Sequence, residues 1–208
     1  MSKVNAILLA GGNSSRYGKD KALICFQEKT LIEIIYSKLN SFFDKVIIVS
    51  NKDDYHFLKN AVIKKDIIKN KGPLGGIYTG LYYSDAEYNF IIGCDMPFIN
   101  ERYFSFLLEK IKESDFDVAA VKKDGYLEPL AALYHRRVLT LVKKNILDDN
   151  LRIKSFYADS RVKVIEKDEL ADYFNLDKLF FNINYPEDKL KAEYFFKLDR
   201  RQKSENGV

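Results

Sequence analysis

A glycine-rich segment with several basic side chains follows the first apolar run of the sequence. Residues 4–10 (VNAILLA) are apolar, and residues 11–22 (GGNSSRYGKDKA) contain Arg16, Lys19 and Lys21. Glycines let an anion approach backbone N–H groups closely, and cationic side chains neutralise a polyphosphate. A buried strand followed by such a segment predicts a phosphate-binding loop; the alternative is an ordinary surface loop with scattered charges.

Two familiar phosphate-binding motifs do not fit this segment. A P-loop follows the pattern GxxxxGK[ST], whereas five residues separate Gly12 from Gly18 and an aspartate follows Lys19. The dinucleotide pattern GxGxxG is also absent, because a second glycine follows Gly11 directly. The segment is therefore predicted to be a different kind of phosphate loop.

A carboxylate stands at the end of another apolar run. Asp95 follows residues 89–93 (NFIIG) closely, so we expect it at the carboxyl end of a buried strand, where open α/β sheets bind ligands. A single hard carboxylate suits Mg²⁺ on nucleotide phosphates, because this ion keeps several waters and takes other ligands from the substrate. The structural alternative is that Asp95 caps the next helix or the Met96-Pro97 turn.

The order of the expected elements favours a parallel sheet between two helical layers. Short apolar runs alternate with segments of helical spacing, and Asp124-Gly125 is a hairpin-type turn signal between residues 117–122 and 130–134. The predicted fold class is α/β: a three-layer α/β/α domain with a mainly parallel sheet and a Rossmann-like nucleotide-binding half. Strands are expected at residues 4–10, 45–49, within 61–68, at 89–93 and at 162–165, and helices at 30–43, 74–84, 100–113, 136–147 and from 186.

Composition limits the number of domains and the class of partner. The chain has 208 residues, of which 47% are hydrophobic and 31% charged, which excludes a wholly disordered protein. The net charge is +4, and residues 197–208 contribute half of it, so no nucleic-acid-binding face is expected. We expect one domain over residues 1–197 and a disordered tail over residues 198–208.

Cysteine usage and the lengths of the apolar runs predict the cellular compartment. Cys25 and Cys94 form no CxxC pair and stand among apolar residues, which favours buried thiols in a reducing compartment. No apolar run approaches the length of a membrane span, and the first is too short for a signal peptide. The sequence predicts a cytoplasmic protein without membrane contacts.

The glycine-rich segment and four later segments together resemble one enzyme family. Residues 8–22 (LLAGGNSSRYGKDKA) are similar to the LAGGxSxRMGxDKA signature of nucleotidyltransferases that activate small molecules, with Tyr17 in place of Met. Within that superfamily the sequence resembles the molybdenum cofactor guanylyltransferase (MobA) family from residue 4 to about residue 197. The other matching segments, in the family's order, are 72–81 (GPLGGIYTGL), 93–99 (GCDMPFI), 128–134 (EPLAALY) and 182–188 (NINYPED).

This resemblance implies a fold of the nucleotide-diphospho-sugar transferase type and a defined reaction. The reaction would be Mg²⁺-dependent transfer of GMP from GTP to the terminal phosphate of molybdopterin, with or without bound molybdenum, releasing pyrophosphate. Transient contacts with cofactor-biosynthesis and molybdoenzyme-maturation proteins are also implied. Alternatives are a cytidylyltransferase acting on the same cofactor and a non-catalytic nucleotide-binding protein that delivers the cofactor.

The resemblance also implies roles for individual residues. It makes Arg16, Lys21 and Asp95 catalytic, and Asp95 the metal ligand. A carboxylate at Asp66 would accept from N1–H and N2–H of guanine, a donor pair that adenine and cytosine lack. The implied nucleotide-binding residues are Leu9, Ala10, Gly11, Gly12, Lys21, Asn51, Asp66 and Asp95, and the implied acceptor-binding residues are Asn182 and Asn184.

Each of these polar residues also has a plain structural interpretation. Lys21 is then a surface lysine, Asn51 a turn residue and Asp66 a charged surface residue. Asn182 and Asn184 alternate, so both face one side of an expected strand; the alternative is that they cap the final helix.

Three glycines fall within one expected helix. Gly75, Gly76 and Gly80 each cost roughly 1 kcal/mol relative to alanine inside a helix. Their clustering indicates a close approach of the helix backbone to a nucleotide base or to a neighbouring element, and tight helix packing is the alternative.

Overall fold

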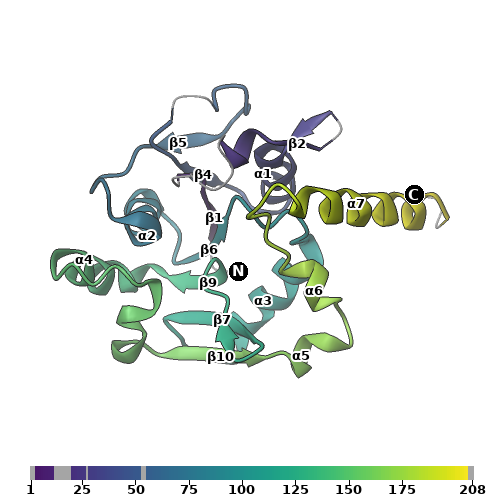
Figure 1. The fold of residues 1–208 in the computed structure, drawn as a ribbon. Coiled ribbons are helices and arrows are strands. Elements are labelled where there is room, and N and C mark those ends of the chain that lie inside the picture. The colour runs from purple at the N-terminus through teal and green to yellow at the C-terminus, as the bar shows by residue number, and fades with distance from the viewer. Residues whose placement is uncertain (1–2, 12–19, 27, 53–54, 206–208) are drawn as a thin grey trace.

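The fold was analysed in a computed structural model, which describes residues 3–11, 20–26, 28–52 and 55–205 (Figure 1). The strands are β1 (Val4–Leu9), β2 (Cys25–Phe26), β3 (Lys29–Thr30), β4 (Val46–Val49), β5 (Val62–Lys64), β6 (Tyr88–Gly93), β7 (Val118–Lys123), β8 (Tyr126–Leu127), β9 (Ala131–His135) and β10 (Val162–Glu166). The helices are α1 (Leu31–Phe42), α2 (Gly72–Tyr83), α3 (Glu101–Glu113), α4 (Leu139–Leu147), α5 (Asp168–Ala171), α6 (Leu176–Leu179) and α7 (Asp188–Glu205), with 3-10 helices η1 (Lys21–Leu23), η2 (Arg136–Val138) and η3 (Ile153–Asp159).

The central sheet is mixed but mostly parallel. Its strand order is β10-β7-β9-β6-β1-β4-β5, and β8 pairs with β7 outside this path. Strand β1 lies between β4 and β6 and is parallel to both, with Leu9 opposite Val49 on one side and Gly93 on the other. Strand β9 runs antiparallel to its neighbours β6 and β7. The predicted α/β class with a mainly parallel sheet is confirmed.

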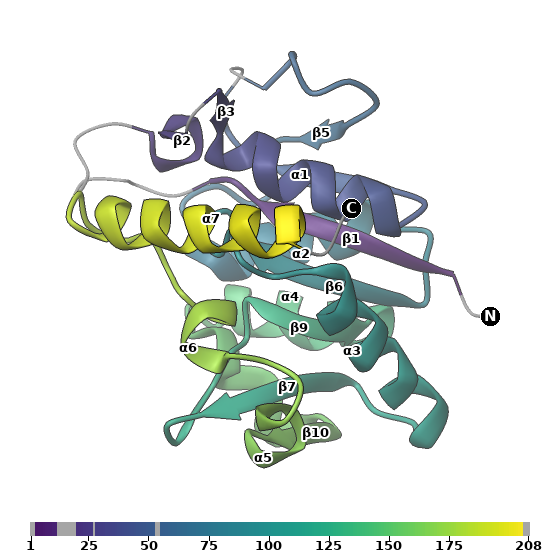
Figure 2. The ribbon, with the colours of Figure 1, turned by 90° about the vertical axis from the view of Figure 1, so that its right-hand side faces the viewer.

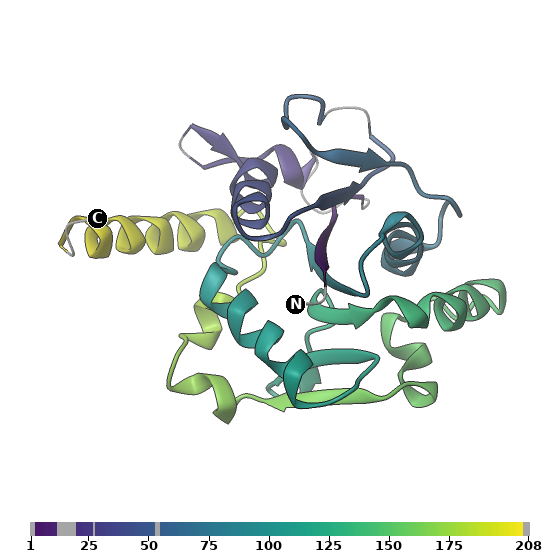
Figure 3. The same ribbon diagram turned by 180° about the vertical axis from the view of Figure 1, so that it is seen from behind.

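Helices cover both faces of this sheet. In β1, Ala6 and Leu8 face the layer that contains α1 and α3, whereas Ile7 and Leu9 face α2 and α4, because successive strand residues point to opposite faces. The views from the front and from behind place α1 and α3 on one side and α2 and α4 on the other (Figures 1 and 3). The predicted three-layer arrangement is therefore present.

The turn at Asp124-Gly125 lies between the two segments that the sequence predicts to form a hairpin. Both residues have positive φ (51° and 83°), the conformation that a tight hairpin turn requires. The turn connects β7 to the short strand β8, which pairs with residues 122 and 123 only. The strand predicted at residues 130–134 is β9, which inserts between β7 and β6. The hairpin prediction is confirmed, because β7 pairs antiparallel with β9, with Val118 opposite Tyr134 and Ala119 opposite Leu133. The short strand β8 within the connection was not predicted.

The last helix differs from the expected tail. Helix α7 extends to Glu205, past residue 198, where the sequence predicts disorder to begin. Its Phe195 and Phe196 pack on Phe98 with ring centroids 5.3 and 4.7 Å apart, which attaches the helix to the α1 and α3 side of the molecule. Figure 2, which looks toward that side, shows α7 lying across the front of the molecule. The domain boundary at residue 197 stays a prediction.

The cysteines differ from expectation as well. Cys25 is exposed and Cys94 is partly exposed, so the prediction of two buried thiols was wrong for Cys25, whose side chain points outward from the short strand β2. Burial nevertheless raises the pKa of the Cys94 thiol to about 12. In the described part of the chain, no helix is long and apolar enough to cross a membrane.

Helix α2 approaches β1 closely at two of its glycines. A Cβ atom at Gly80 would lie 2.3 Å from Ile7 Cγ2, and one at Gly76 would lie 3.1 Å from Leu9 Cδ2. The third glycine, Gly75, faces the preceding loop, with Ile68 O at 3.1 Å from such an atom. Gly76 and Gly80 therefore allow close packing of α2 on β1, a neighbouring element, and Gly75 allows close packing on the preceding loop.

Replacing Gly80 by alanine tests this packing. Although alanine favours a helix, Gly80→Ala forces Ile7 away from its place in β1, and we expect a net loss of about 1–3 kcal/mol in the free energy of unfolding. Urea unfolding measures the change. Gly76→Ala is the matched control, with a smaller loss, because its nearest neighbour lies farther away. Equal losses in the free energy of unfolding for Gly80→Ala and Gly76→Ala would contradict the packing argument.

Candidate active site

Three parallel strands end side by side and form the base of the site. Ala10 N donates to Val49 O at 2.9 Å, and Cys94 N donates to Leu9 O at 3.1 Å, so the residues after β1, β4 and β6 are joined directly. Ser50 Oγ lies 3.4 Å from Ala10 O. Because the carboxyl ends of β1, β4 and β6 meet here, segments that are far apart in the sequence meet at one edge of the sheet.

A cavity of about 190 Å³ opens at this edge. Its wall contains Leu9, Ala10 and Gly11 of the predicted nucleotide-binding set, together with Lys21 and Asp95. The remaining lining residues are Asp20, Pro73, Gly93, Cys94 and Leu130. Two of the predicted catalytic residues thus share one cavity with the end of β1.

Lys21 and Asp95 form an ion pair in this cavity. Lys21 Nζ lies 3.4 Å from Asp95 Oδ2, and the two side chains are 19% and 26% exposed. Gly93 leaves room for the carboxylate, since a Cβ atom there would lie 2.7 Å from Asp95 Oδ1. The structure therefore brings together the cation and the carboxylate that the sequence assigns to catalysis.

Asn184 completes a set of oxygens around the same ammonium group. Lys21 Nζ donates to Asn184 Oδ1 at 3.1 Å and to Ile183 O at 3.2 Å. Ile183 N in turn donates to Asp95 O at 2.9 Å, which links this segment to the end of β6. A carboxylate, an amide oxygen and a backbone carbonyl thus surround one positive charge.

Asn182 does not share this position. Its Nδ2 group lies 3.3 Å from Phe180 O, and residues 181–184 form no strand. The prediction that Asn182 and Asn184 face one side of a strand was wrong, because Ile183 is buried between them and bonds to Asp95 rather than to a neighbouring strand. Whether Asn182 contacts the acceptor stays a prediction.

Asn51 and Asp66 form a separate, reciprocal pair. Asn51 Nδ2 donates to Asp66 Oδ2 at 2.8 Å, and Asp66 N donates to Asn51 Oδ1 at 3.0 Å. The second carboxylate oxygen, Oδ1, is buried and has no hydrogen-bond partner among the described residues. Burial raises the pKa of Asp66, and the hydrogen bond from Asn51 partly offsets that rise. The pair presents one unsatisfied acceptor, and it lies outside the lining of the cavity around Asp95.

Gly12 and Arg16, which the sequence assigns to nucleotide binding and catalysis, lie outside the described residues. The residues on either side of them are described. Ala10 and Gly11 line the cavity from the end of β1, and Asp20 and Lys21 line it from the start of η1. The roles of Gly12 and Arg16 stay predictions.

Three acidic residues near the site were not singled out from the sequence. Asp20 lines the cavity, and Asp188 Oδ2 accepts from the backbone N–H groups of Asn184 and Tyr185 at 2.8 Å each. Burial raises the pKa of Glu128, and the charge of Asp95 adds to that rise. Asp20, Asp188 and Glu128 belong to the DKA, NINYPED and EPLAALY segments respectively, and membership in these segments could have marked them as site residues. No spacing rule, however, distinguishes them from acidic residues on the surface.

Comparison with known proteins agrees with this geometry. Residues 6–164 match a family model described as the MobA-like NTP transferase domain. The chain belongs to the MobA-like NTP transferase family. The matched range contains β1 from Ala6 onward, Lys21 and Asp95, whereas Asn184 follows it.

Curated members of the MobA-like NTP transferase family are similar over most of their length. A "probable molybdenum cofactor guanylyltransferase" of Peptoclostridium acidaminophilum is 35% identical over 189 residues, covering 88% of this chain and 86% of the relative. The molybdenum cofactor guanylyltransferase of Desulfosudis oleivorans is 33% identical over 201 residues, covering 96% and 99%. Both alignments therefore span nearly whole chains.

A solved structure has the same fold. The molybdopterin-guanine dinucleotide biosynthesis protein A of Archaeoglobus fulgidus superposes with a TM-score of 0.83 at 24% identity, covering 93% of this chain and 98% of that one. The expected nucleotidyltransferase fold is thereby confirmed for this MobA-like NTP transferase.

The raised pKa of Asp66 predicts how stability depends on pH. A carboxyl whose pKa is higher in the folded state destabilises the fold once pH exceeds its unfolded value, and the penalty is complete above the folded value. Asp66→Asn should therefore raise the melting temperature at pH 7 and have little effect at pH 3.

Asp85→Asn is a control of opposite sign. Hydrogen bonds from Lys3 and Asn5 lower the pKa of Asp85, so its charged form stabilises the folded protein. Differential scanning calorimetry at both pH values should show a lower melting temperature for Asp85→Asn at pH 7. A decrease for Asp66→Asn at pH 7 would contradict the burial argument.

Proposed function

We propose that this MobA-like NTP transferase transfers GMP from GTP to the terminal phosphate of molybdopterin and releases pyrophosphate. The observation that carries the proposal is that Asp95 and Asn184 both contact the ammonium group of Lys21, and that Lys21 and Asp95 line one cavity. These residues come from the first, third and last of the matching segments. The names of the relatives, which align over nearly their whole length, support the choice of substrates.

Asp66 is the residue that we propose selects the base. Its Oδ1 atom is buried without a partner among the described residues, and a guanine presents two N–H donors to such a carboxylate. Asn51 holds the other oxygen and the backbone N–H of Asp66, so the carboxylate has a defined orientation before the nucleotide arrives. Cytosine and adenine lack the donor pair and would leave a buried charge unpaired.

The residues around Lys21 fit a bound Mg²⁺ ion. Asp95 Oδ2, Asn184 Oδ1 and Ile183 O are hard oxygen donors that already surround one ammonium group. We propose Asp95 as the protein's metal ligand, with waters and nucleotide phosphates completing the shell. When bound, Mg²⁺ neutralises phosphate charge and polarises the phosphorus–oxygen bonds.

The chemistry that remains for the protein is positioning and charge neutralisation. An oxygen of the acceptor phosphate forms a bond to the α-phosphorus of GTP, and the bond from that phosphorus to the bridging oxygen of the β-phosphate breaks. The electron pair leaves with pyrophosphate, and no proton needs to be removed from the anionic nucleophile. Lys21 stabilises the charge on the phosphates, and the sequence assigns Arg16 the same role.

Asn182 and Asn184 belong to the acceptor side in this proposal. The contact of Asn184 with Lys21, the proposed phosphate-binding cation, supports this role for Asn184. We propose that the reaction takes place in the cytoplasm, with transient delivery of the cofactor to and from other proteins of the same route.

Removal of the Asp95 charge tests the catalytic role. Asp95→Asn keeps the size of the side chain, so the fold should persist, and pyrophosphate release should fall by roughly three orders of magnitude. A coupled phosphate assay with GTP, Mg²⁺ and molybdopterin measures it, with circular dichroism as the folding control. Turnover within tenfold of wild type would rule out Asp95 as the metal ligand.

The choice of base is tested by calorimetric titration with GTP and CTP, each with Mg²⁺. Asp66 predicts a GTP preference of about tenfold or more, because an unpaired buried acceptor costs on the order of 1–3 kcal/mol. Asp66→Asn should remove most of that preference. A CTP preference would instead assign the cytidylyltransferase activity and refute the role of Asp66.

A further inference from the structure

The cavity wall contains a carboxylate that the reaction does not explain. Asp20 precedes Lys21, lines the same cavity and is only 13% exposed. A negative charge so placed repels nucleotide phosphates unless it is neutralised. The groups that surround Asp20 therefore bear directly on nucleotide binding.

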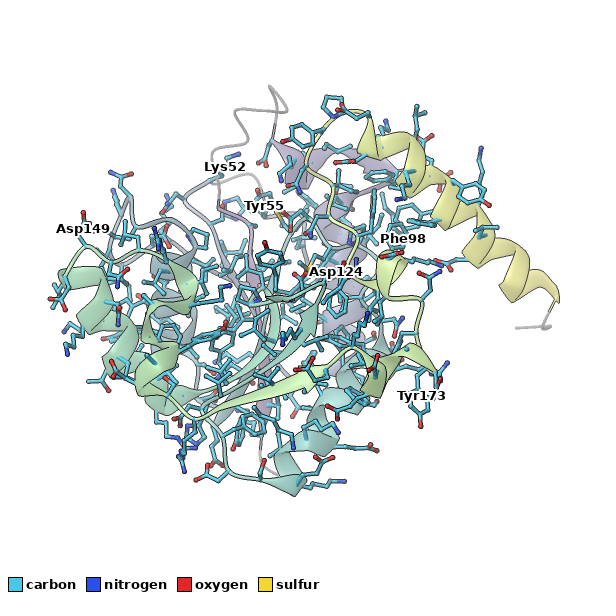
Figure 4. All side chains as sticks on the ribbon, turned by 60° about the horizontal axis from the view of Figure 1, so that its bottom comes forward. Lys52, Tyr55, Phe98, Asp124, Asp149 and Tyr173 are labelled. Atoms are coloured by element: carbon cyan, nitrogen blue, oxygen red, sulfur yellow. The ribbon has the colours of Figure 1, made fainter. Side chains whose placement is uncertain are left out.

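Two donors bind the same oxygen of this carboxylate. Lys52 Nζ lies 2.8 Å from Asp20 Oδ2, and the Tyr55 hydroxyl lies 2.9 Å from it. Lys52 neutralises the charge, and Tyr55 adds a hydrogen bond to an ionised acceptor, which is stronger than a bond between neutral groups. Figure 4 shows Lys52 at the edge of the molecule and Tyr55 inward from it.

The other oxygen of Asp20 determines where η1 begins. Asp20 Oδ1 accepts from Ala22 N at 3.1 Å, as the N-cap of that helix. Lys21 is the first residue of η1, so the orientation of the Asp20 carboxylate controls the direction in which the Lys21 side chain leaves the backbone. The ammonium group of Lys21 then reaches Asp95 and Asn184.

Tyr55 connects this carboxylate to the end of β1. Its side chain is completely buried, and its hydroxyl also lies 3.3 Å from Ala10 O. The phenol has one hydrogen, and the charged acceptor at the shorter distance receives it. Burial and the neighbouring Asp20 raise the pKa of Tyr55, so the group stays a neutral donor at physiological pH.

We infer that Tyr55 and Lys52 are positioning residues for nucleotide binding, acting through Asp20. They hold the carboxylate in the orientation that starts η1 at Lys21, and they neutralise its charge beside the nucleotide phosphates. The inference rests on the proposed function only in requiring a nucleoside triphosphate as ligand; it does not depend on the base. Neither Lys52 nor Tyr55 lines the cavity itself.

The two residues predict different results on substitution. Tyr55→Phe removes only the hydroxyl, so GTP·Mg²⁺ should bind about tenfold more weakly as Lys21 loses its fixed orientation. Lys52→Met leaves the Asp20 charge without its cation and should weaken binding by a similar factor. Asp20→Asn removes that charge, so the double variant Lys52→Met, Asp20→Asn should bind more tightly than Lys52→Met alone.

The experiment is calorimetric titration of the full chain with GTP·Mg²⁺, combined with a double-mutant cycle between Tyr55→Phe and Asp20→Asn. If Tyr55 acts through Asp20, the loss of GTP affinity in the double variant should be severalfold smaller than the product of the losses in the two single variants. Tyr36→Phe is the matched control. It removes a phenol hydroxyl that donates to Lys59 O at 2.7 Å, outside the cavity lining, and should change the melting temperature but not nucleotide affinity.

The outcomes separate this inference from the proposed function. Wild-type affinity for GTP in Tyr55→Phe, or independent effects of Tyr55→Phe and Asp20→Asn, would overturn the inference and leave the guanylyltransferase proposal standing. If the wild type prefers CTP, the same variants titrated with CTP test the inference while the base assignment fails. A wild-type protein that binds neither nucleotide would overturn both.

Discussion

The parallel pairing of β1 with both β4 and β6 is the constraint on which the site depends. Leu9 stands opposite Val49 and Gly93, so the three strands end at one level and the residues that follow them are neighbours. Close packing of α2 on β1, which Gly76 and Gly80 permit, keeps that strand in place from one face of the sheet. A shift of one residue in this register would exchange the faces of β1 and separate Ala10 from the residue after β6.

The acidic residues of the site differ in what balances their charge. Asp95 is paired with Lys21, Asp20 with Lys52 and Tyr55, and Asp66 with the neutral amide of Asn51. Asp95, which we propose as the metal ligand, would exchange its Lys21 partner for another cation when Mg²⁺ is bound, whereas Asp20 has separate partners in Lys52 and Tyr55. Asp66 keeps a buried acceptor without a partner among the described residues, which is unfavourable for the free protein and suited to a ligand with N–H donors.

Contacts between distant parts of the chain explain where the structure departs from the sequence-based expectations. The segment around Asn182 and Asn184 alternates as a strand does, yet Ile183 bonds to Asp95 and the segment stays irregular. The predicted pairing of the strand at residues 130–134 with β7 is confirmed, whereas the pairing of β9 with β6 on its other side was not predicted, because a turn signal relates only the two strands that it joins. Helix α7 extends past residue 198, and its Phe195 and Phe196 pack on Phe98, a contact between distant parts of the chain.

The sequence by itself determined the fold class and the family resemblance, and it singled out Lys21 and Asp95, which share one cavity in the structure. Those features depend on short stretches of the chain. The spacing of apolar residues indicates which face of each strand or helix is buried, and each of the residues singled out belongs to a short motif that directly follows an apolar run. Only the tertiary structure decided that Lys21 binds both Asp95 and Asn184, that Asn51 orients Asp66, and that Tyr55 and Lys52 hold Asp20. Such contacts join residues from separate loops, and their distances follow from strand register and helix packing, which spacing along the sequence does not encode.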